Sequence, residues 1–286
     1  MIIEKAYAKI NLFLNVTDCR DDGYHDIESV MHAVDLHDII SMDTKDSDKP
    51  EIILSSNSPL LSSSSSNLAY IAAEKYLSKY GINAQININL EKRIPIGAGL
   101  GGGSSDAAAT LRALNKIYNA ANFEELLEIA LSIGSDVPFC LLGGTAHCLG
   151  RGEIMTAKAV KKKMHFVIAI GNERTSTPEA YRRLDSLYSE SGFPEKSELC
   201  EKMCINLESA DDISSCVYNI FESVTDISDV KKIKEEMMKN GAKSALMSGS
   251  GPSVFGIFKS IEDSQLALKS LLSKGYTAFA CESVCD

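Results

Sequence analysis

The sequence has 286 residues, no tryptophan and only seven prolines, and its charged residues favour one sign. Lysine and arginine number 29 against 39 aspartates and glutamates, which gives a formal net charge of −10. A chain of this charge repels phosphate backbones, so we expect no nucleic-acid partner. Long hydrophobic runs are missing as well. No stretch approaches the roughly 18 to 20 apolar residues of a membrane span, so we expect no membrane partner.

Cysteine motifs are also absent, although the chain has eight cysteines. None forms a C-x-x-C pair, but Cys200 and Cys204 stand four residues apart and could share one face of a helix. No histidine pattern accompanies them, and this favours free thiols over a zinc site. The first residues lack the basic-then-apolar order of a secretory signal. Together with free thiols, this predicts a cytoplasmic protein.

Hydrophobic residues make up 44% of the chain, and their spacing predicts an α+β protein with two domains, 1–160 and 161–286. The helical and strand-like segments interleave along the whole chain, with strands dominating the first 60 residues. The expected strands are 5–16, 30–42, 51–54, 84–90, 144–148, 166–170, 245–248, 254–258 and 276–280. The expected helices are 67–80, the segment after residue 106 to about 118, 123–132, 178–187, 200–206, 216–221, 230–240 and 260–274.

A glycine-rich loop at 95–106 is the most informative motif. It packs five glycines into seven residues and runs into an alanine-rich helical segment. Glycine allows close approach of the backbone to a ligand, and a helix N-terminus offers unpaired N–H groups to anions such as phosphate. Ser104 and Ser105 are expected to cap this helix. A Walker A loop is excluded because no lysine precedes Ser104, and a dinucleotide-binding loop is disfavoured because no apolar strand stands before the motif.

Three residues are candidates for chemistry beside a bound phosphate: Lys9, His25 and Asp136. Asp136 stands before Val137 and Pro138, where partial desolvation and a nearby lysine would fit it to attract a hydroxyl proton. Each has a plainer interpretation, since Lys9 could be an exposed strand residue and the other two could be turn residues. Spacing along the sequence leaves open whether the three meet in space.

Three separated blocks of the sequence resemble the signature motifs of the GHMP small-molecule kinases. They are the segments 6–12, 95–108 and 249–255. Within that superfamily the chain is most similar to the branch that acts on a cytidine-diphospho methylerythritol. The block Arg20-Asp21-Asp22-Gly23-Tyr24-His25 carries this finer resemblance, because other GHMP kinases lack it.

The resemblance implies an N-terminal domain of the ribosomal-protein-S5-like type and a C-terminal ferredoxin-like domain. It implies phosphorylation of the 2-hydroxyl of the sugar alcohol with ATP and Mg²⁺, a step of the non-mevalonate isoprenoid precursor pathway. Two alternatives stay open. One is a GHMP kinase for mevalonate or homoserine, and the other is a catalytically silent nucleotide-binding regulator on the same fold. No obligate protein partner is expected.

The resemblance also implies roles for individual residues. Lys9 and Asp136 would be the catalytic pair, with Asp136 taking the proton of the 2-hydroxyl. The residues implied in substrate binding are Asn11, Tyr24, His25, Thr177 and Tyr181. Those implied in ATP binding are Asn67, Lys92, Pro95, Ile96, Gly97, Ala98, Gly99, Leu100, Gly101, Gly102, Gly103, Ser104 and Ser105. Tyr181 stands where many relatives have phenylalanine. Asp106 stands where some have asparagine, and we favour a role at the helix N-terminus for it over contact with magnesium. The resemblance assigns no Mg²⁺ ligand.

Overall fold

A computed structural model describes residues 1–59, 61, 65–173 and 176–284, and in it the chain forms two compact units. Unit 1 comprises Met1–Ala8, Leu36–Ile96 and Gly101–Gly143, and unit 2 comprises Lys9–Asp35, Gly97–Leu100 and Gly144–Asp286. Strands β1 (Ile2–Cys19) and β2 (His25–Asp46) contribute residues to both. The two compact units are therefore not separated by one boundary in the sequence near residue 160. The predicted domains 1–160 and 161–286 stay a prediction.

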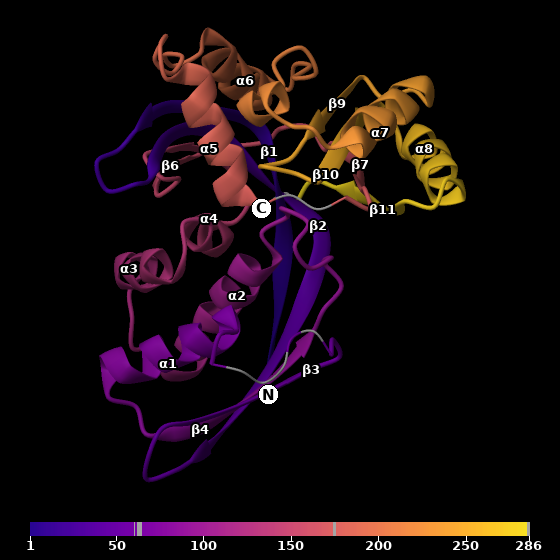
Figure 1. Cartoon of the computed structure of the whole chain (residues 1–286). Helices are drawn as coiled ribbons and strands as arrows, with labels where there is room; N and C mark the ends of the chain where they lie inside the picture. Colours follow the sequence, from indigo (N-terminus) through magenta and orange to yellow (C-terminus); the bar gives the residue numbers. More distant parts are fainter. Residues whose placement is uncertain (60, 62–64, 174–175, 285–286) are drawn as a thin grey trace. The chain divides into compact units, whose positions relative to one another are not determined.

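Unit 1 combines strands with a group of four helices (Figure 1). Strand β4 (Ala84–Glu91) pairs antiparallel with β2 and parallel with β3 (Glu51–Ser56). The helices are α1 (Leu68–Tyr80), α2 (Gly102–Tyr118), α3 (Phe123–Ile133) and α4 (Val137–Leu142). The core joins small alanines of α1 and α2 to aliphatic side chains of the strands, so the two helices can approach each other closely.

Helix α1 has the ends that the sequence predicts. The Asn67 side chain accepts a hydrogen bond from Ala69 N at 2.9 Å, and Gly81 ends the helix with a positive φ of 63°. Helix α2 begins earlier than expected. Its N-cap is Gly101 at φ 68°, so Ser104 and Ser105 lie within the first turn and the expectation that they cap the helix is wrong. The run of glycines accounts for this, because Gly101 adopts the left-handed conformation before any serine is reached.

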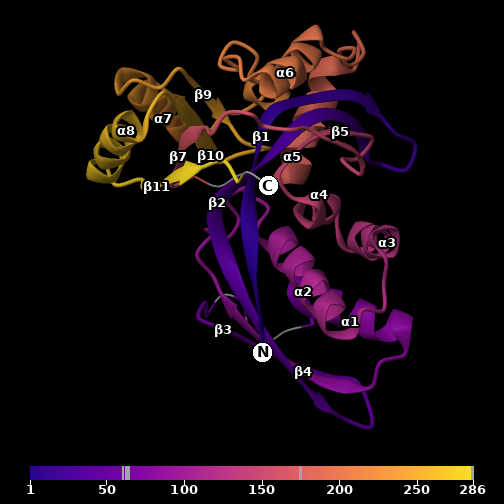
Figure 2. The same ribbon diagram turned by 180° about the vertical axis from the view of Figure 1, so that it is seen from behind.

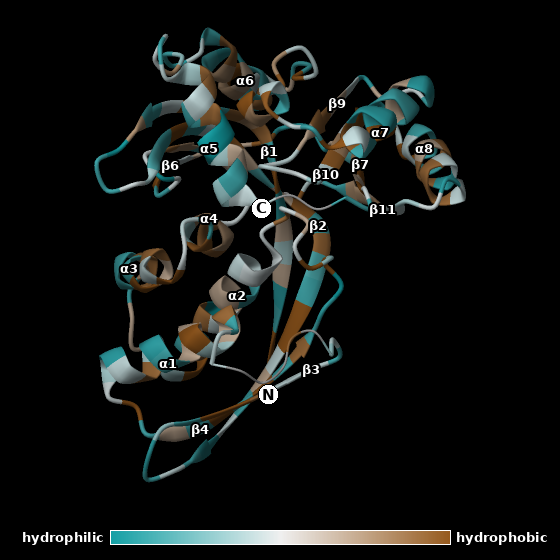
Figure 3. Cartoon of the chain, viewed as in Figure 1, coloured by the Kyte–Doolittle hydropathy of each residue, from teal (hydrophilic) through white to brown (hydrophobic). Residues whose placement is uncertain are grey.

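Unit 2 contains a four-stranded antiparallel sheet with the order β11-β7-β10-β9. Helices α7 (Ser228–Lys239) and α8 (Ile261–Ser273) pack against it (Figure 2). The sheet strands are β7 (His165–Ile170), β9 (Ser244–Met247), β10 (Ser253–Phe258) and β11 (Thr277–Glu282). Chain order and strand order together give the βαββαβ arrangement of a ferredoxin-like domain, which confirms the expected fold. Strand β10 is buried along its whole length, and α7 is mostly hydrophilic (Figure 3).

Unit 2 also contains the parts of β1 and β2 between Lys9 and Asp35, and three short strands extend the sheet there. Strand β5 pairs antiparallel with both β2 and β6, and β8 pairs parallel with β1. These elements are β5 (Thr145–Leu149), β6 (Ile154–Ala157), α5 (Thr177–Tyr188), α6 (Glu198–Ser209) and β8 (Tyr218–Asn219). Over the residues that the structure describes, no helix combines the length and the apolar character needed to cross a membrane.

Two local expectations differ from the structure. The segment 216–221, expected as a helix, forms the short strand β8 and a 3₁₀ turn at Ile220–Ser223. Pairing with β1 overrides the local helical pattern, since Phe13 and Leu14 lie opposite Tyr218 and Asn219. Asp136, which by sequence could be a turn residue, is instead the N-cap of the short helix α4.

Candidate active site

Lys9 and Asn11 lie on one face of β1, because side chains two residues apart in a strand point the same way. Both are buried. Lys9 Nζ donates a hydrogen bond to Asn11 Oδ1 at 2.9 Å, and Asn11 Nδ2 donates to Ser29 Oγ at 2.9 Å. Ser29 Oγ in turn donates to the carbonyl oxygen of Phe13. The amide of Asn11 is therefore fixed in one orientation, with its oxygen toward the lysine ammonium.

Part of the glycine-rich loop, Gly97–Leu100, lies beside these residues in unit 2. The backbone N–H of Lys9 donates to the carbonyl oxygen of Leu100 at 3.0 Å. Gly97 and Gly99 have φ values of 73° and 76°, a region that favours glycine. The loop therefore takes a course that residues with a Cβ would strain.

The second glycine-rich turn, at 249–253, closes the same cluster. A Cβ on Gly99 would lie 2.8 Å from the carbonyl oxygen of Gly251, and Gly249 lies beside the Asn11 amide oxygen. Asn11 N also donates to Ser248 Oγ at 3.2 Å. Parts of all three motifs, which lie almost 250 residues apart in the sequence, thus meet in unit 2.

Asn219 is a residue of this cluster that the sequence did not single out. Its Nδ2 donates to the carbonyl oxygens of Met247 and Gly249, at 2.7 and 2.8 Å. Its Oδ1 accepts from the backbone N–H of Phe221. One buried amide thus holds the second glycine turn, and only the long-range pairing of β8 with β1 brings it there.

The remainder of the glycine-rich loop belongs to unit 1 and opens α2. The first intrahelical bond runs from Ser105 N to the carbonyl oxygen of Gly101, so the N–H groups of Gly102, Gly103 and Ser104 precede it. Such N–H groups and the positive end of the helix dipole favour an anion. The Ser105 hydroxyl donates to the carbonyl oxygen of Tyr7 and is therefore committed to the fold.

A buried charge cluster lies next to the start of α2. Lys92 Nζ is 2.5 Å from Asp38 Oδ2 and 2.7 Å from Asp106 Oδ2. Asp38 Oδ1 also accepts from the backbone N–H groups of Arg93 and Ile94, so it fixes the chain just after β4. Burial raises the pKa of Asp106 to about 8, despite the opposing effect of Lys92. Nothing in the sequence near Asp38 indicates that it would pair with Lys92, which lies 54 residues further along the chain.

Two further residues, Asn67, implied in ATP binding, and Asp136, implied in catalysis, stand at helix starts in unit 1. Asn67 is the N-cap of α1, and its proposed nucleotide contact stays a prediction. Asp136 is the N-cap residue of α4 and is half-buried, and its carbonyl oxygen accepts from Cys140 N at 3.1 Å. This places the carboxylate at the positive end of a short helix, with Pro138 in the first turn.

The aromatic residues implied in substrate binding lie in unit 2. His25 stacks on Tyr181 with ring centroids 4.4 Å apart, and its Nε2 lies 2.7 Å from Asp185 Oδ1. Tyr24 is exposed, and the Arg151 guanidinium lies 3.5 Å from its ring centroid. The rings of His25 and Tyr181 therefore stack directly on each other. Contact of either ring with a substrate stays a prediction.

Thr177, at the start of α5, shares a hydrogen bond of 2.8 Å with Ser250 of the second glycine turn. This residue was implied in substrate binding, and the structure connects it to the motif cluster of unit 2. Substrate contact stays a prediction.

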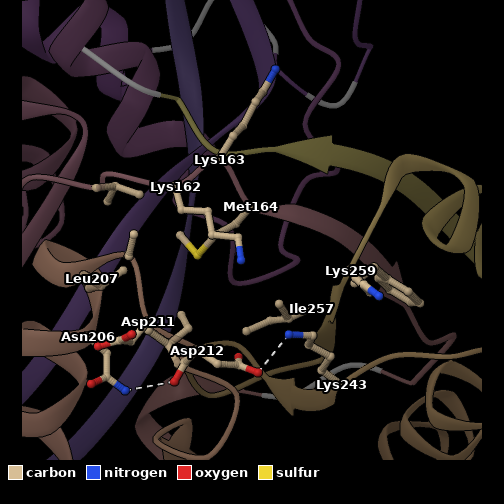
Figure 4. A pocket seen from close by; sticks show the side chains of 14 residues that line it. Lys162, Lys163, Met164, Asn206, Leu207, Asp211, Asp212, Lys243, Ile257 and Lys259 are labelled. Atoms are coloured by element: carbon tan, nitrogen blue, oxygen red, sulfur yellow. Dashed lines mark hydrogen bonds and ion pairs between the residues drawn. The ribbon is translucent and has the colours of Figure 1, made fainter.

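A separate cavity of about 60 Å³ lies in unit 2 between α6, β10 and the segment before β7 (Figure 4). Its lining includes the apolar side chains of Leu207 and Ile257 and several lysines. Lys243 is paired there with Asp212 at 2.8 Å. None of the residues predicted for the active site is among the described residues that line it, so it is not the candidate site.

Comparison with known proteins first defines the class. Residues 67–144 match the model of the GHMP kinases N terminal domain, and residues 224–277 match that of the GHMP kinases C terminal domain. A mevalonate kinase from L. major has the same fold, with a TM-score of 0.81 over 100% of this chain and 97% of its own, at 13% identity. The fold is therefore that of a GHMP kinase.

Closer relatives give the particular family. The chain is 39% identical to a 4-diphosphocytidyl-2-C-methyl-D-erythritol kinase of Caldicellulosiruptor saccharolyticus, covering 99% of this chain and 98% of the relative. It is 42% identical to the same-named kinase of Alkaliphilus oremlandii, covering 93% and 91%. A crystal structure of a 4-(cytidine 5'-diphospho)-2C-methyl-D-erythritol kinase matches with a TM-score of 0.84 and 31% identity over all of both chains. The chain belongs to the 4-diphosphocytidyl-2-C-methyl-D-erythritol kinase family, and it is a kinase.

Proposed function

We propose that this kinase transfers the γ-phosphoryl group of ATP to the 2-hydroxyl of 4-diphosphocytidyl-2-C-methyl-D-erythritol, in the non-mevalonate isoprenoid precursor pathway. The observation that carries the proposal is the meeting of Lys9, Gly99 and Gly249 in unit 2, within a chain about 40% identical to kinases named for that substrate. Phosphoryl transfer depends mainly on positioning and on charge stabilisation, and rigid glycine turns beside a buried lysine suit both.

The proposed division of roles follows the chemistry of each group. Asp136 takes the proton of the acceptor hydroxyl as it attacks the γ-phosphorus, and the bond from that phosphorus to the ADP oxygen breaks. Lys9 stabilises the negative charge that develops on the transferred phosphoryl group. Asn11, whose oxygen holds Lys9, keeps the ammonium in one position. The N–H groups of Gly102, Gly103 and Ser104 bind the ATP phosphates.

Cytosine recognition is assigned to the aromatic cluster of unit 2. Tyr24 is exposed and can stack on a base with the ring face away from Arg151, and His25 can hydrogen bond to the base edge through Nδ1 because Asp185 engages its Nε2. One face of Tyr181 is already covered by His25, so we assign Tyr181 the role of orienting the imidazole together with Asp185.

Magnesium accompanies ATP in kinases, but the acidic residue nearest the loop does not fit a metal ligand. One oxygen of Asp106 is held by Lys92, and Asp106 Oδ1 is buried without a hydrogen-bond partner among the described residues. A raised pKa favours the protonated carboxyl, which binds cations poorly. We therefore derive no step through a metal held by this chain.

An ADP-release assay tests the proposal with three acceptors: 4-diphosphocytidyl-2-C-methyl-D-erythritol, mevalonate and homoserine. We expect turnover with the cytidine compound and rates at least about 10²-fold lower with the other two, because neither offers a base to the aromatic cluster. Preferred turnover of mevalonate or homoserine would contradict the proposal. ATP binding without turnover of any acceptor would instead support a nucleotide-binding regulator.

A further inference from the structure

Helix α6 carries two buried cysteines toward strands β2 and β5 of unit 2. Cys200 and Cys204 are one turn apart on the same helix face, and both are buried. A carboxylate oxygen of Glu28, a ring nitrogen of His147 and the sulfur of Cys200 all lie within 4.8 Å of one another. The three residues come from β2, β5 and α6, so the cluster exists only in the folded chain.

Strand register places the glutamate and the histidine on the same face of the sheet. His147 lies opposite Val30 in the antiparallel pair of β5 and β2. Glu28 precedes Val30 by two residues and therefore points to the same side. The side chains of Glu28 and His147 are diagonal neighbours that both face α6.

The imidazole in this cluster has an unused ligand atom. His147 Nε2 is buried and has no hydrogen-bond partner among the described residues. Glu28 Oε1, at 3.8 Å, is too far away for a hydrogen bond. Burial lowers the pKa of His147, and this favours the neutral, metal-binding form. The other oxygen of Glu28 accepts from Ser197 N at 2.8 Å, which orients the carboxylate.

We propose that Glu28, His147, Cys200 and Cys204 form a binding site for one thiophilic divalent cation of the Zn²⁺ class, outside the catalytic centre. Two sulfurs, one imidazole nitrogen and one carboxylate oxygen make a ligand set that zinc accepts in tetrahedral geometry. The cation displaces the thiol protons as it binds, and the resulting thiolates balance its charge. The sequence argued against zinc because no histidine pattern accompanies the cysteines, but the fold supplies His147 from β5.

A second cluster in unit 2 serves as a contrast. Cys19, His25 and Asp185 also place their ligand atoms within 4.8 Å of one another. There, however, His25 Nε2 is already engaged by Asp185 at 2.7 Å, and Cys19 is exposed. This makes Cys19→Ser a matched control, because it removes a cysteine from the cluster that we expect to stay empty.

The test titrates Co²⁺ into the full-length, untagged protein after reduction and removal of metals. Thiolate ligation of cobalt gives a near-ultraviolet charge-transfer band, and Zn²⁺ should then displace the cobalt at one equivalent per chain. We expect the band in the wild type and in Cys19→Ser, and its loss in Cys200→Ser/Cys204→Ser. Loss of a group that only hydrogen bonds to a metal ligand typically weakens metal binding by roughly 10–100-fold. His147→Ala removes a ligand itself, so it should weaken cobalt binding by more than this.

Far-ultraviolet circular dichroism checks that each variant is folded. If the double serine variant does not fold, Glu28→Gln and His147→Ala carry the test, and both must weaken cobalt binding. The proposal is overturned if the wild type shows no charge-transfer band, or if Cys19→Ser loses the band. It is also overturned if folded variants at Glu28 and His147 bind cobalt as tightly as the wild type.

Discussion

A Cβ on Gly99 would lie only 2.8 Å from the carbonyl oxygen of Gly251, so the two glycine-rich turns are in backbone contact. Gly99 also has a φ of 76°. No side chain fits at this position without displacing backbone, because the nearest atoms belong to the second turn rather than to a flexible side chain. The course of the first glycine-rich loop therefore depends on the position of a turn about 150 residues later.

Gly99→Ala should accordingly impair the kinase more than a positive φ alone can explain. Backbone strain at such a φ costs about 1–3 kcal/mol, and the contact with Gly251 adds to it. We expect an ATP KM raised at least tenfold and a lowered Tm. Gly275→Ala is the matched control, since Gly275 has a φ of 85° with open space around it. Equal losses of ATP affinity in both variants would show that the contact with the second turn is unimportant.

Asn219→Ala should destabilise the second glycine turn. It removes two hydrogen bonds to backbone carbonyls and leaves the buried N–H of Phe221 without its acceptor, a loss of about 1–3 kcal/mol. Chemical denaturation measures this free energy of unfolding. Asn206→Ala removes a half-buried amide that donates to the Asp212 carbonyl oxygen and, at 4.0 Å, to Cys216 Sγ, and it should cost much less. If Asn219→Ala lowers the free energy of unfolding no more than Asn206→Ala does, Asn219 does not hold the second glycine turn in place.

Stability should depend on pH through Asp106. Because its pKa is raised from 3.8 to about 8, the folded protein retains a proton that the unfolded chain releases near pH 4. The contribution of Asp106 to the free energy of unfolding is fully present below about pH 4. It declines as the pH rises, by at most about 1.4 kcal/mol for each pH unit. It is lost once the pH has risen through about 8. Asp106→Asn removes this dependence.

The measurement compares unfolding free energies of the wild type and Asp106→Asn between about pH 5 and about pH 9. We expect the variant to gain stability relative to the wild type as the pH rises. Asp43→Asn, at an exposed carboxylate of the same unit, is the control and should show no such trend. If the Asp106→Asn difference is constant across this range, Asp106 does not retain its proton.

His25→Ala should affect the cytidine substrate selectively. Loss of a base contact is worth roughly 1–3 kcal/mol, so we expect the KM for that substrate to rise about 5- to 150-fold, with little change in the KM for ATP. A uridine analogue should be a poor substrate of the wild type, because its base edge exchanges donors and acceptors. A fall in Tm with equal effects on both substrates would instead indicate that His25 only supports Tyr181 and Phe193.

Local signals in the sequence were enough to predict helix α1 and the glycine loop. Asn67 and Gly81 carry the cap chemistry in their residue types, and runs of glycine before alanine favour a loop that opens a helix. The alternation of strands and helices in the last third of the chain also predicted an α+β arrangement, whereas the ferredoxin-like strand order was expected only from the family resemblance.

Contacts between distant segments could not be predicted in this way. Asp38 meets Lys92 only because β2 and β4 pair, and nothing near Asp38 in the sequence marks it as a partner. The local pattern of Cys216–Phe221 is helical, but pairing with β1 makes part of it a strand. His147 reaches Cys200 through the register of β5 on β2. In each case the deciding interaction lies between elements, where residue spacing carries no information.

The most direct test of the proposed mechanism is the activity of Asp136→Asn with 4-diphosphocytidyl-2-C-methyl-D-erythritol, measured together with its ATP affinity by calorimetry. If Asp136 takes the proton of the acceptor hydroxyl, kcat should fall by about 10²–10⁴-fold while the Kd for ATP stays within about twofold. Lys9→Met should also lower kcat, and the double variant should be little worse than the worse single variant, because residues that act as one unit are not additive. A kcat for Asp136→Asn within tenfold of the wild type, in a folded protein that binds ATP normally, would contradict the account.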